Sequence, residues 1–390
     1  MNNFEYYSPT RIIFGKDTHK QVGELVKQYA GTGKVLFHFG GSSIKASGLY
    51  GQVQDALRGS GVDFLELGGV QPNPRLKLVR EAVRLCKEND IRLILAVGGG
   101  SVIDSAKAAA LGALYDGDVW DFYKRAAVPT GALPVATILT IPAAGSESSD
   151  GSVITNEETK DKLSCDADIL RPVFSILNPA LCYTLPKYQI ACGASDILAH
   201  MMERYFTNTK AVDYSDRAIE AGMRCLLNVA PRVYAAETPD YDDWCNFVWT
   251  GTMAHSNIIG VDRTQDWASH NIEHEISALY DIAHGAGLSI VFPAWIRHVY
   301  KDNPSRFVQW AVRVFDVDLA YEDADAIVAE AVCRLERFYK TLDMPIRLSD
   351  ANIDGENLAR MAQKAVRYGA TGNLKKLGEQ DVLAILKLAL

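Results

Sequence analysis

The sequence predicts an α/β domain with a mostly parallel sheet, followed by an all-α domain. In the first half, short β-branched runs alternate with amphipathic helical stretches, a pattern that is typical of βαβ units. The run Leu93–Val97 is apolar at every position, as expected for a strand that is covered by helices on both faces. Beyond residues 184–186 strand signals nearly vanish, and long helical patterns continue to residue 390.

The elements follow from these patterns in chain order. Strands are expected at 11–14, 34–39, 63–67, 92–97, 135–140 and 173–177. The helical patterns between them cover 17–30, 43–60, 75–90 and 101–115. The change of pattern at 184–186 predicts a boundary there, which gives domains of 1–185 and 186–390. A chain of this length has room for two such cores.

Composition excludes several classes of function. The net charge of −8 and the pI near 5.6 argue against a surface that binds nucleic acid. No apolar run reaches the ~20 residues of a membrane span, and the first residues lack the basic and apolar parts of a signal peptide. The seven cysteines are scattered and form no CxxC pair. This usage is typical of reduced thiols, so we expect a cytoplasmic protein without a membrane partner.

Two glycine loops follow predicted strands. The strand at 92–97 runs into Gly98-Gly99-Gly100-Ser101 and then a helical pattern. Glycines let the backbone approach a ligand, and a helix N-terminus offers free N–H groups, so this loop is expected to hold phosphates. The spacing differs from GxGxxG, and a bare tight turn is the alternative. The hydroxyl-rich segment 139–149 is expected at the rim of a nucleotide cleft, or in a surface loop.

The second glycine loop bears on cofactor choice. It reads Gly40-Gly41-Ser42-Ser43 and is followed by Lys45. Folds that prefer NAD usually place an acidic residue near the adenosine ribose, whereas here the groups are small and neutral with a lysine nearby. The loop therefore favours NADP(H), with NAD(H) as a possible substitute. An ordinary turn with a solvated lysine is the alternative.

Histidines and one aspartate recur at helical spacing. Asp196 and His200 are four residues apart, as are His270 and His274, and His284 follows ten residues later. Residues four apart share a helix face, and imidazole and carboxylate are the usual ligands of a catalytic transition metal. A helix-face hydrogen bond is the alternative for the first pair. We expect the other histidines to be structural: His19, His38, His255 and His298.

In combination, these motifs resemble those of the iron-containing (group III) alcohol dehydrogenases. The resemblance covers essentially the whole chain and is greatest to the NADP(H)-dependent butanol dehydrogenase and aldehyde reductase branch. The motifs that carry it are Gly98-Gly99-Gly100-Ser101-x2-Asp104-x-Ala106-Lys107, Gly145-Ser146-Glu147, Asp196-x3-His200 and His270-x3-His274-x9-His284-Gly285.

The resemblance implies a dehydroquinate synthase-like fold, with an N-terminal dinucleotide-binding domain and a C-terminal metal-binding domain of helices that faces a cleft. It implies metal ligation by Asp196, His200, His270 and His284. His274 corresponds to a histidine near the nicotinamide and substrate, and we take it as the candidate for relaying the alcohol proton. The ligand set suits Fe(II), which the family favours, and also Zn(II) or Mn(II).

The resemblance also implies the cofactor contacts. The adenosine end maps onto Gly40, Gly41, Ser42 and Ser43, and the pyrophosphate and its neighbourhood map onto Gly98, Gly99, Gly100, Ser101 and Asp104. The ribose and nicotinamide side maps onto Thr140, Ser146, Ser149, Lys162, Leu181 and Thr184. Three positions depart from the family pattern: Ala144 replaces a threonine, Asn178 an aspartate, and Ser42 a glycine.

The implied function is metal-dependent hydride transfer between NADP(H) and a short to medium linear alcohol or aldehyde, in a homodimer. A zinc-dependent polyol or glycerol dehydrogenase and a dehydroquinate synthase are alternatives within the superfamily. A non-haem iron oxygenase is an alternative of another class, which would need no dinucleotide loops. A non-catalytic metal or nucleotide binder would keep the ligands without consuming cofactor.

Overall fold

The computed structural model describes residues 1–319 and 323–390 and divides into two compact units, Tyr7–Leu185 and Pro186–Leu390 together with Met1–Tyr6. Residues 1–6 group with the helical unit, although the sequence pattern placed them in the α/β domain. These residues bond to a distant segment of the helical unit, since the Asn2 N–H donates to the Asp262 carbonyl at 2.8 Å. The Asn2 amide also donates to Thr264 Oγ1 at 3.2 Å.

The α/β unit is built on a six-stranded sheet in which every neighbouring pair is parallel. The central strands are buried along almost their whole length, because helices cover both faces. This is the predicted fold class for the first half. The spatial order is β1 (Arg11–Phe14), β8 (Phe174–Leu177), β5 (Val135–Ile141), β4 (Ile91–Gly99), β2 (Lys34–Phe39) and β3 (Phe64–Leu67).

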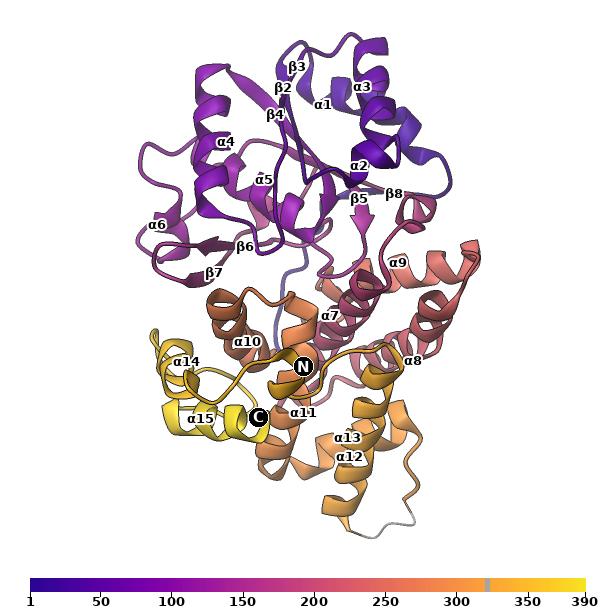
Figure 1. Cartoon of the computed structure of the whole chain (residues 1–390), viewed down its shortest axis with the longest axis vertical. Helices are drawn as coiled ribbons and strands as arrows, with labels where there is room; N and C mark the ends of the chain where they lie inside the picture. The colour runs from indigo at the N-terminus through magenta and orange to yellow at the C-terminus, as the bar shows by residue number, and fades with distance from the viewer. Residues whose placement is uncertain (320–322) are drawn as a thin grey trace. The chain divides into compact units, whose positions relative to one another are not determined.

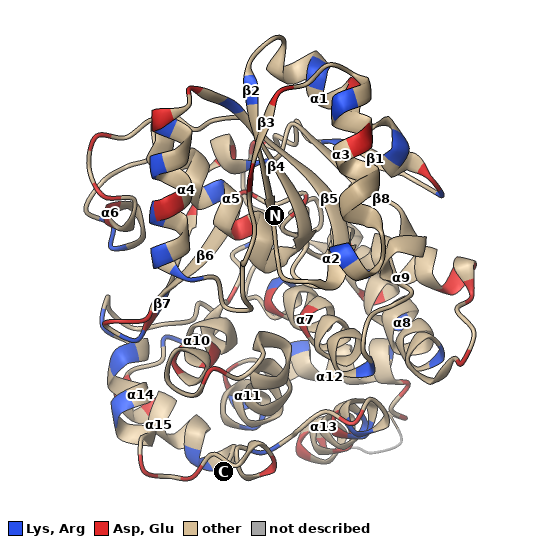
Figure 2. Ribbon diagram, turned by 45° about the horizontal axis from the view of Figure 1, so that its top comes forward, with Lys and Arg blue, Asp and Glu red and all other residues tan. Residues whose placement is uncertain are grey.

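Two helical layers flank this sheet (Figure 1). On one side α1 (Val22–Ala30) and α3 (Leu49–Gly59) share a core with β2 and β4. On the other side lie α4 (Leu76–Glu88) and α5 (Gly100–Ala113), with the short α6 (Trp120–Tyr123). The buried residues of α4 recur every three or four positions, and charged residues run along the same helix in Figure 2. The layers therefore follow from ordinary amphipathic patterning.

Two of the differences between the structure and the predicted elements have a local cause. The helix expected over 43–60 is divided into α2 (Ser43–Ala46) and α3, because Gly48 takes a positive φ of 80°. The antiparallel hairpin of β6 (Gly151–Asn156) and β7 (Asp161–Asp166) was missed. These strands carry many polar residues, and several of them are nevertheless buried, so the hairpin lacks the alternation that predicts a half-buried strand.

The second unit is helical, as expected. Its main helices are α7 (Lys187–Tyr205), α8 (Asp213–Ala235), α9 (Tyr241–His255), α10 (Ala268–Tyr280), α11 (His284–Val299), α12 (Pro304–Phe315), α13 (Ala324–Thr341), α14 (Leu358–Ala365) and α15 (Glu379–Leu388). Short 3₁₀ turns lie at Tyr300–Asp302 and Ser349–Ala351 in this unit, and at Thr18–Gln21, Asp168–Leu170 and Pro179–Cys182 in the α/β unit.

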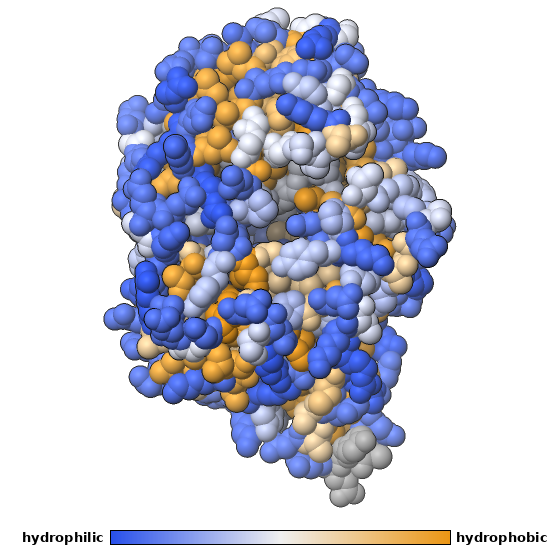
Figure 3. Space-filling view, viewed as in Figure 1, coloured by the Kyte–Doolittle hydropathy of each residue, from blue (hydrophilic) through white to orange (hydrophobic). Residues whose placement is uncertain are grey.

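α7 carries the first two candidate ligands and is buried at every position from Ile190 to Tyr205. Among the described residues, no helix combines the length and hydropathy that crossing a membrane requires. The face shown in Figure 3 mixes hydrophilic residues with smaller apolar areas, as is usual for protein surfaces.

Candidate metal centre and nucleotide loops

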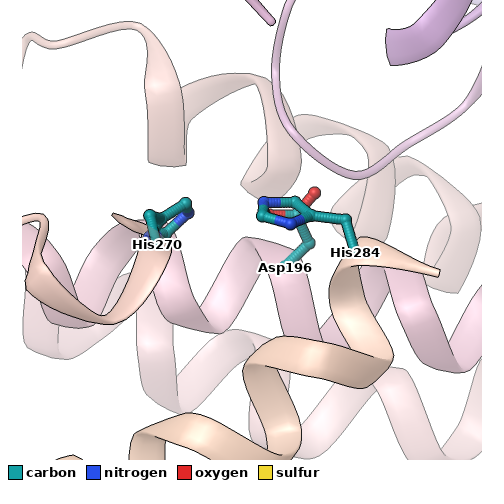
Figure 4. A group of neighbouring side chains, drawn as sticks. All are labelled: Asp196, His270 and His284. Atoms are coloured by element: carbon teal, nitrogen blue, oxygen red, sulfur yellow. The ribbon is translucent and has the colours of Figure 1, made fainter. Parts of the chain in front are cut away.

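Three helices of the helical unit bring the candidate metal ligands together. Asp196 comes from α7, His270 from α10, and His284 is the first residue of α11. Their side chains point toward one another (Figure 4), and one donor atom from each lies within 4.8 Å of the others. Asp196 and His284, which are 88 positions apart in the sequence, thus belong to one compact donor set.

Two glycines allow α11 to lie against α7 and α10 at once. A Cβ at Gly285 would overlap with the backbone of Cys192 on α7. A Cβ at Gly287 would lie 2.6 Å from Cγ of Glu273 on α10. Ser195 Oγ also donates to the Gly285 carbonyl at 2.7 Å. This close packing sets the position of His284 at the start of α11.

Two buried glutamates orient the histidine rings. Glu203 Oε1 accepts from Nδ1 of His270 at 2.9 Å and from its backbone N–H at 3.1 Å. Glu273 Oε2 forms the corresponding hydrogen bond with Nδ1 of His284. Both carboxyl groups are fully buried. Because each glutamate bonds to Nδ1, Nε2 is the ring atom on the side away from the glutamate, as in carboxylate–histidine–metal arrangements.

Neither glutamate was assigned a role in the sequence analysis. The available signal was weak: Glu203 and Glu273 each follow a candidate ligand by three residues on the same helix. Moreover, Glu273 bonds to His284 on the next helix, not to His270 on its own. That pairing depends on helix packing, which spacing along the chain does not reveal.

The donor atoms have the protonation and the unmet bonding that a cation needs. In the described part of the chain, His270 Nε2 is buried without a hydrogen-bond partner. The buried Asp196 Oδ1 has an ion-pair contact with His200 Nδ1 at 2.9 Å. Burial, reinforced by the neighbouring histidines, holds the pKa of His270 well below its usual value. Burial alone would raise the pKa of Asp196, but the nearby His200 keeps it below its ordinary range. An unpaired buried nitrogen such as His270 Nε2 is costly, and a divalent cation would bind it together with the Asp196 carboxylate, so the residues fit a metal.

His200 lies beside this donor set but outside it. Its Nδ1 is 2.9 Å from both the carbonyl oxygen and Oδ1 of Asp196, and its hydrogen bond goes to the carbonyl. Nε2 is therefore the atom left for ligation. The ring centroids of His200 and His270 are 4.6 Å apart, so the fourth predicted ligand is adjacent to the other three.

His274 falls in a second, overlapping group with Glu273 and His284. Its ring centroid is 5.5 Å from that of His284. Glu273 already bonds to His284 Nδ1, so this group is an extension of the first one and not a separate centre. The predicted proton-relay residue thus lies next to a predicted ligand, and its role stays a prediction.

An aromatic and cationic cluster packs against the same histidines. The His255 ring centroid is 4.3 Å from that of His200, and its Nδ1 lies 2.8 Å from Arg204 Nη2. The ring centroids of Trp267 and His270 are 4.9 Å apart. The backbone of Trp267 has an uncommon positive φ of 68°. His255, which was expected to be structural, thus lies beside the donor set.

In the α/β unit, the predicted nucleotide loops lie at the carboxyl ends of neighbouring strands. β5, β4 and β2 are adjacent and parallel, so Thr140, Gly98–Ser101 and Gly40–Ser43 all lie at carboxyl ends of neighbouring strands. The helices after β2 and β4 pack on opposite faces. Such a switch point in an open parallel sheet forms the crevice where nucleotides bind.

The glycines of these loops differ in what they allow. A Cβ at Gly98 would overlap with Val102, and one at Gly99 would lie 2.8 Å from Cβ of Ile141. A Cβ at Gly100 would meet only the Ala144 methyl group, at 3.6 Å. Gly41 is exposed, and its Cβ position is open. The first loop is therefore sterically restricted, whereas position 41 can accept a side chain.

Three of the predicted cofactor residues, Asp104, Ser146 and Ser149, form hydrogen bonds that connect α5 to the 145–153 segment. Asp104 accepts from Ser146 Oγ at 2.6 Å and from the Val153 N–H at 2.9 Å. The fully buried Lys107 donates to the carbonyls of Ser146 and Ser149 at 2.7 and 2.8 Å, and burial lowers its pKa to about 8. These contacts shape the 145–153 segment. Direct contact of Asp104, Ser146 and Ser149 with a cofactor stays a prediction.

The other predicted cofactor residues come from separate elements of the α/β unit. Ser101 is in the first turn of α5, Lys162 is a buried residue of β7, Leu181 belongs to a 3₁₀ turn, and Thr184 follows that turn. Asn178, which stands where the family pattern has an aspartate, has a local role. Its Oδ1 accepts from the Ala180 N–H at 3.1 Å, and its Nδ2 lies 3.1 Å from Nδ1 of the buried His19.

Comparison with known proteins agrees with both halves of this arrangement. Residues 9–179 match the family described as iron-containing alcohol dehydrogenase, and residues 190–390 match its C-terminal part. The chain is 44% identical over 390 residues to the probable NADH-dependent butanol dehydrogenase 1 of Bacillus subtilis, with 100% of both chains covered. It is 35% identical over 388 residues to the NADPH-dependent aldehyde reductase YqhD of Escherichia coli, covering 99% of this chain and 97% of that one.

A solved structure gives the same result for the fold. The crystal structure of NADH-dependent butanol dehydrogenase A from Thermotoga maritima superposes with a TM-score of 0.95 at 40% identity, covering 100% of this chain and 99% of that one. The family resemblance of the motifs and the predicted fold class are thereby confirmed. Since both family segments match in order, this chain belongs to the iron-containing alcohol dehydrogenase family.

Proposed function

We propose that the chain transfers a hydride between a nicotinamide dinucleotide and an alcohol or aldehyde, with a ferrous ion held by Asp196, His200, His270 and His284. The observation that carries this proposal is His270 Nε2, which is buried without a hydrogen-bond partner and grouped with donor atoms of Asp196 and His284. When bound there, the ion would act as a Lewis acid toward the substrate oxygen.

The chain's own residues have distinct roles in this proposal. Glu203 and Glu273 hold the Nδ1 protons of His270 and His284, which directs both Nε2 atoms to the ion. His274, close to His284, relays the alcohol proton through a ring nitrogen. Trp267 packs against His270 and shields it from water, which strengthens electrostatic interactions at the centre.

The relatives support short alcohols and aldehydes as substrates, since they are named butanol dehydrogenases and an aldehyde reductase. They differ in cofactor: those from Bacillus and Clostridium are named NADH-dependent and YqhD is named NADPH-dependent. We propose that NADP(H) is accepted and preferred, because the Gly40–Ser43 loop places no carboxylate against a 2′-phosphate.

The test is the decrease of absorbance at the reduced-nicotinamide band with butanal as substrate. Protein stripped of metal is reloaded anaerobically with Fe(II) or Zn(II), and NADPH and NADH are compared. Metal-dependent oxidation supports the reaction and the ligand set. Protein that binds metal but oxidises neither cofactor would contradict the proposal and would lead to a screen of polyols.

The charge at position 41 tests the cofactor preference. Gly41→Asp should raise the KM for NADPH about tenfold and the KM for NADH much less, because a carboxylate near the 2′-phosphate costs about 1–2 kcal/mol. The open space at this position lets Gly41→Asn serve as a control of equal size without charge. Equal effects of Gly41→Asp on both cofactors would remove the 2′-phosphate argument.

The glutamates that orient the ligand histidines should affect the affinity for the metal. Glu203→Ala is expected to weaken metal binding about 10- to 100-fold, since His270 loses the group that orients its ring. Glu203→Gln keeps an acceptor for Nδ1 and should retain most of the affinity. Competition with a chromophoric chelator measures both variants, and circular dichroism checks the fold. Unchanged affinity in the alanine variant would show that Glu203 does not position the ligand.

A further inference from the structure

The first turn of α10, which carries His270, is capped by groups from outside the helix. Its N-cap residue is Trp267, whose backbone has a positive φ of 68° and whose indole N–H can only donate. The N–H groups at a helix start need acceptors, and buried carboxylates supply them. Asp266 Oδ1 accepts from the Ala268 N–H at 3.0 Å, and Glu203 accepts from the His270 N–H. The position of His270 therefore depends on residues that precede or face its helix.

Asp266 also binds a segment near the end of the chain. Its Oδ2 accepts from the backbone N–H groups of Asn373 and Leu374, both at 2.7 Å. These two residues belong to Thr371–Leu374, which we call the C-terminal loop and which connects α14 to α15. α14 packs against α10 (Figure 1). One buried carboxylate thus joins backbone N–H groups from two segments that are 108 positions apart.

Two more hydrogen bonds fix the C-terminal loop to the start of α10. Asn271 Nδ2 donates to Oγ1 of the buried Thr371 at 2.8 Å. Asn373 Nδ2 donates to the Gln265 carbonyl at 2.7 Å. Since Asn271 directly follows His270, the loop is bonded to the chain both before and after this candidate ligand.

We propose that Asp266 is a positioning residue, which joins the C-terminal loop to the first turn of α10 and thereby holds His270 in place for the metal. The inference rests on the proposed function in that a metal occupies the site. Without these bonds the first turn of α10 would open more often, because helix ends open at low free-energy cost. Such opening moves His270 Nε2 away from the donor atoms of Asp196 and His284, with which it is grouped.

Asp266→Asn tests the link with a change of one side-chain atom. The amide keeps one oxygen, which can serve Ala268 or the C-terminal loop but not both, because its NH2 group donates. In metal-free protein, amide hydrogen exchange in the first turn of α10 and in the loop should become about five- to tenfold faster. Affinity for Co(II), measured by chelator competition, should decrease about tenfold. The visible absorption bands of bound Co(II), which report coordination geometry, should shift.

Two glycines in the same segment give a matched pair of variants. Gly372 and Gly369 have positive φ values of 81° and 111°, so alanine strains the backbone at either position. A Cβ at Gly372 would lie 2.6 Å from the Lys375 carbonyl oxygen and 3.3 Å from Asp266 Oδ2, whereas a Cβ at Gly369 has open space around it. Gly372→Ala should therefore repeat the effects of Asp266→Asn on exchange and Co(II) binding. Gly369→Ala should lower the thermal midpoint alone.

Three results would overturn the inference. These are unchanged exchange in the first turn of α10 in both Asp266→Asn and Gly372→Ala, unchanged Co(II) affinity and absorption in both, or an equal loss of Co(II) affinity in Gly369→Ala. If Asp266→Asn does not fold, Gly372→Ala decides. Failure of the proposed function has a different signature, since the unmodified protein would then bind no Co(II). The exchange comparison would still decide whether the C-terminal loop holds α10.

Discussion

His284→Ala should lose bound metal and lower kcat at least about a thousandfold, with the fold intact. Loss of a Lewis acid that stabilises developing charge by several kcal/mol corresponds to a rate decrease of this size. The side chain of His284 is 23% exposed and stands at the start of α11, so its removal leaves no large buried cavity. Metal content after dialysis, kcat with butanal and the thermal midpoint are measured together.

His298→Ala is the matched control for this experiment. His298 is near the other end of the same helix, with Nε2 2.9 Å from Asp381 Oδ1, and it lies outside both groups of candidate ligand atoms. This variant should retain metal and activity. Full activity of His284→Ala in metal-depleted buffer would contradict the ligand assignment.

Gly285→Ala should destabilise the helical unit and weaken metal binding at the same time. The added methyl group meets the Cys192 backbone, which cannot turn aside as a flexible side chain can. Overpacking of this kind costs about 1–3 kcal/mol, or a decrease of several degrees in the thermal midpoint. Since His284 is the preceding residue, any shift of α11 away from α7 also displaces a ligand.

Gly51→Ala provides the comparison. Gly51 lies inside α3, and its Cβ position has no atom within 4 Å, so alanine should stabilise that helix by about 0.5–1 kcal/mol. Calorimetry and metal titration are applied to both variants. If Gly285→Ala melts and binds metal like the unmodified protein, close contact between α7 and α11 does not set the geometry of the centre.

Much of the α/β unit could be read from local patterns. Leu93–Val97 predicted a strand buried on both faces, and β4 contains it. The polar hairpin β6–β7 could not be read in this way. Its buried Ser152 donates to the Asp104 carbonyl, and its Val153 N–H donates to the Asp104 side chain. Such strands are stabilised by contacts that arise only when distant segments have folded together.

In the candidate site, too, some features follow from local sequence and others depend on tertiary packing. Helical spacing by itself placed Asp196 with His200 and His270 with His274, because 3.6 residues per turn is a local property of the chain. The order of the glycine loops and histidines was also sufficient to predict the family. Only the tertiary structure decided that Glu203 orients His270, that Glu273 orients His284 from another helix, and that His255 lies beside His200. Those pairings depend on how closely α7, α10 and α11 approach, and the packing of Gly285 and Gly287 sets that distance.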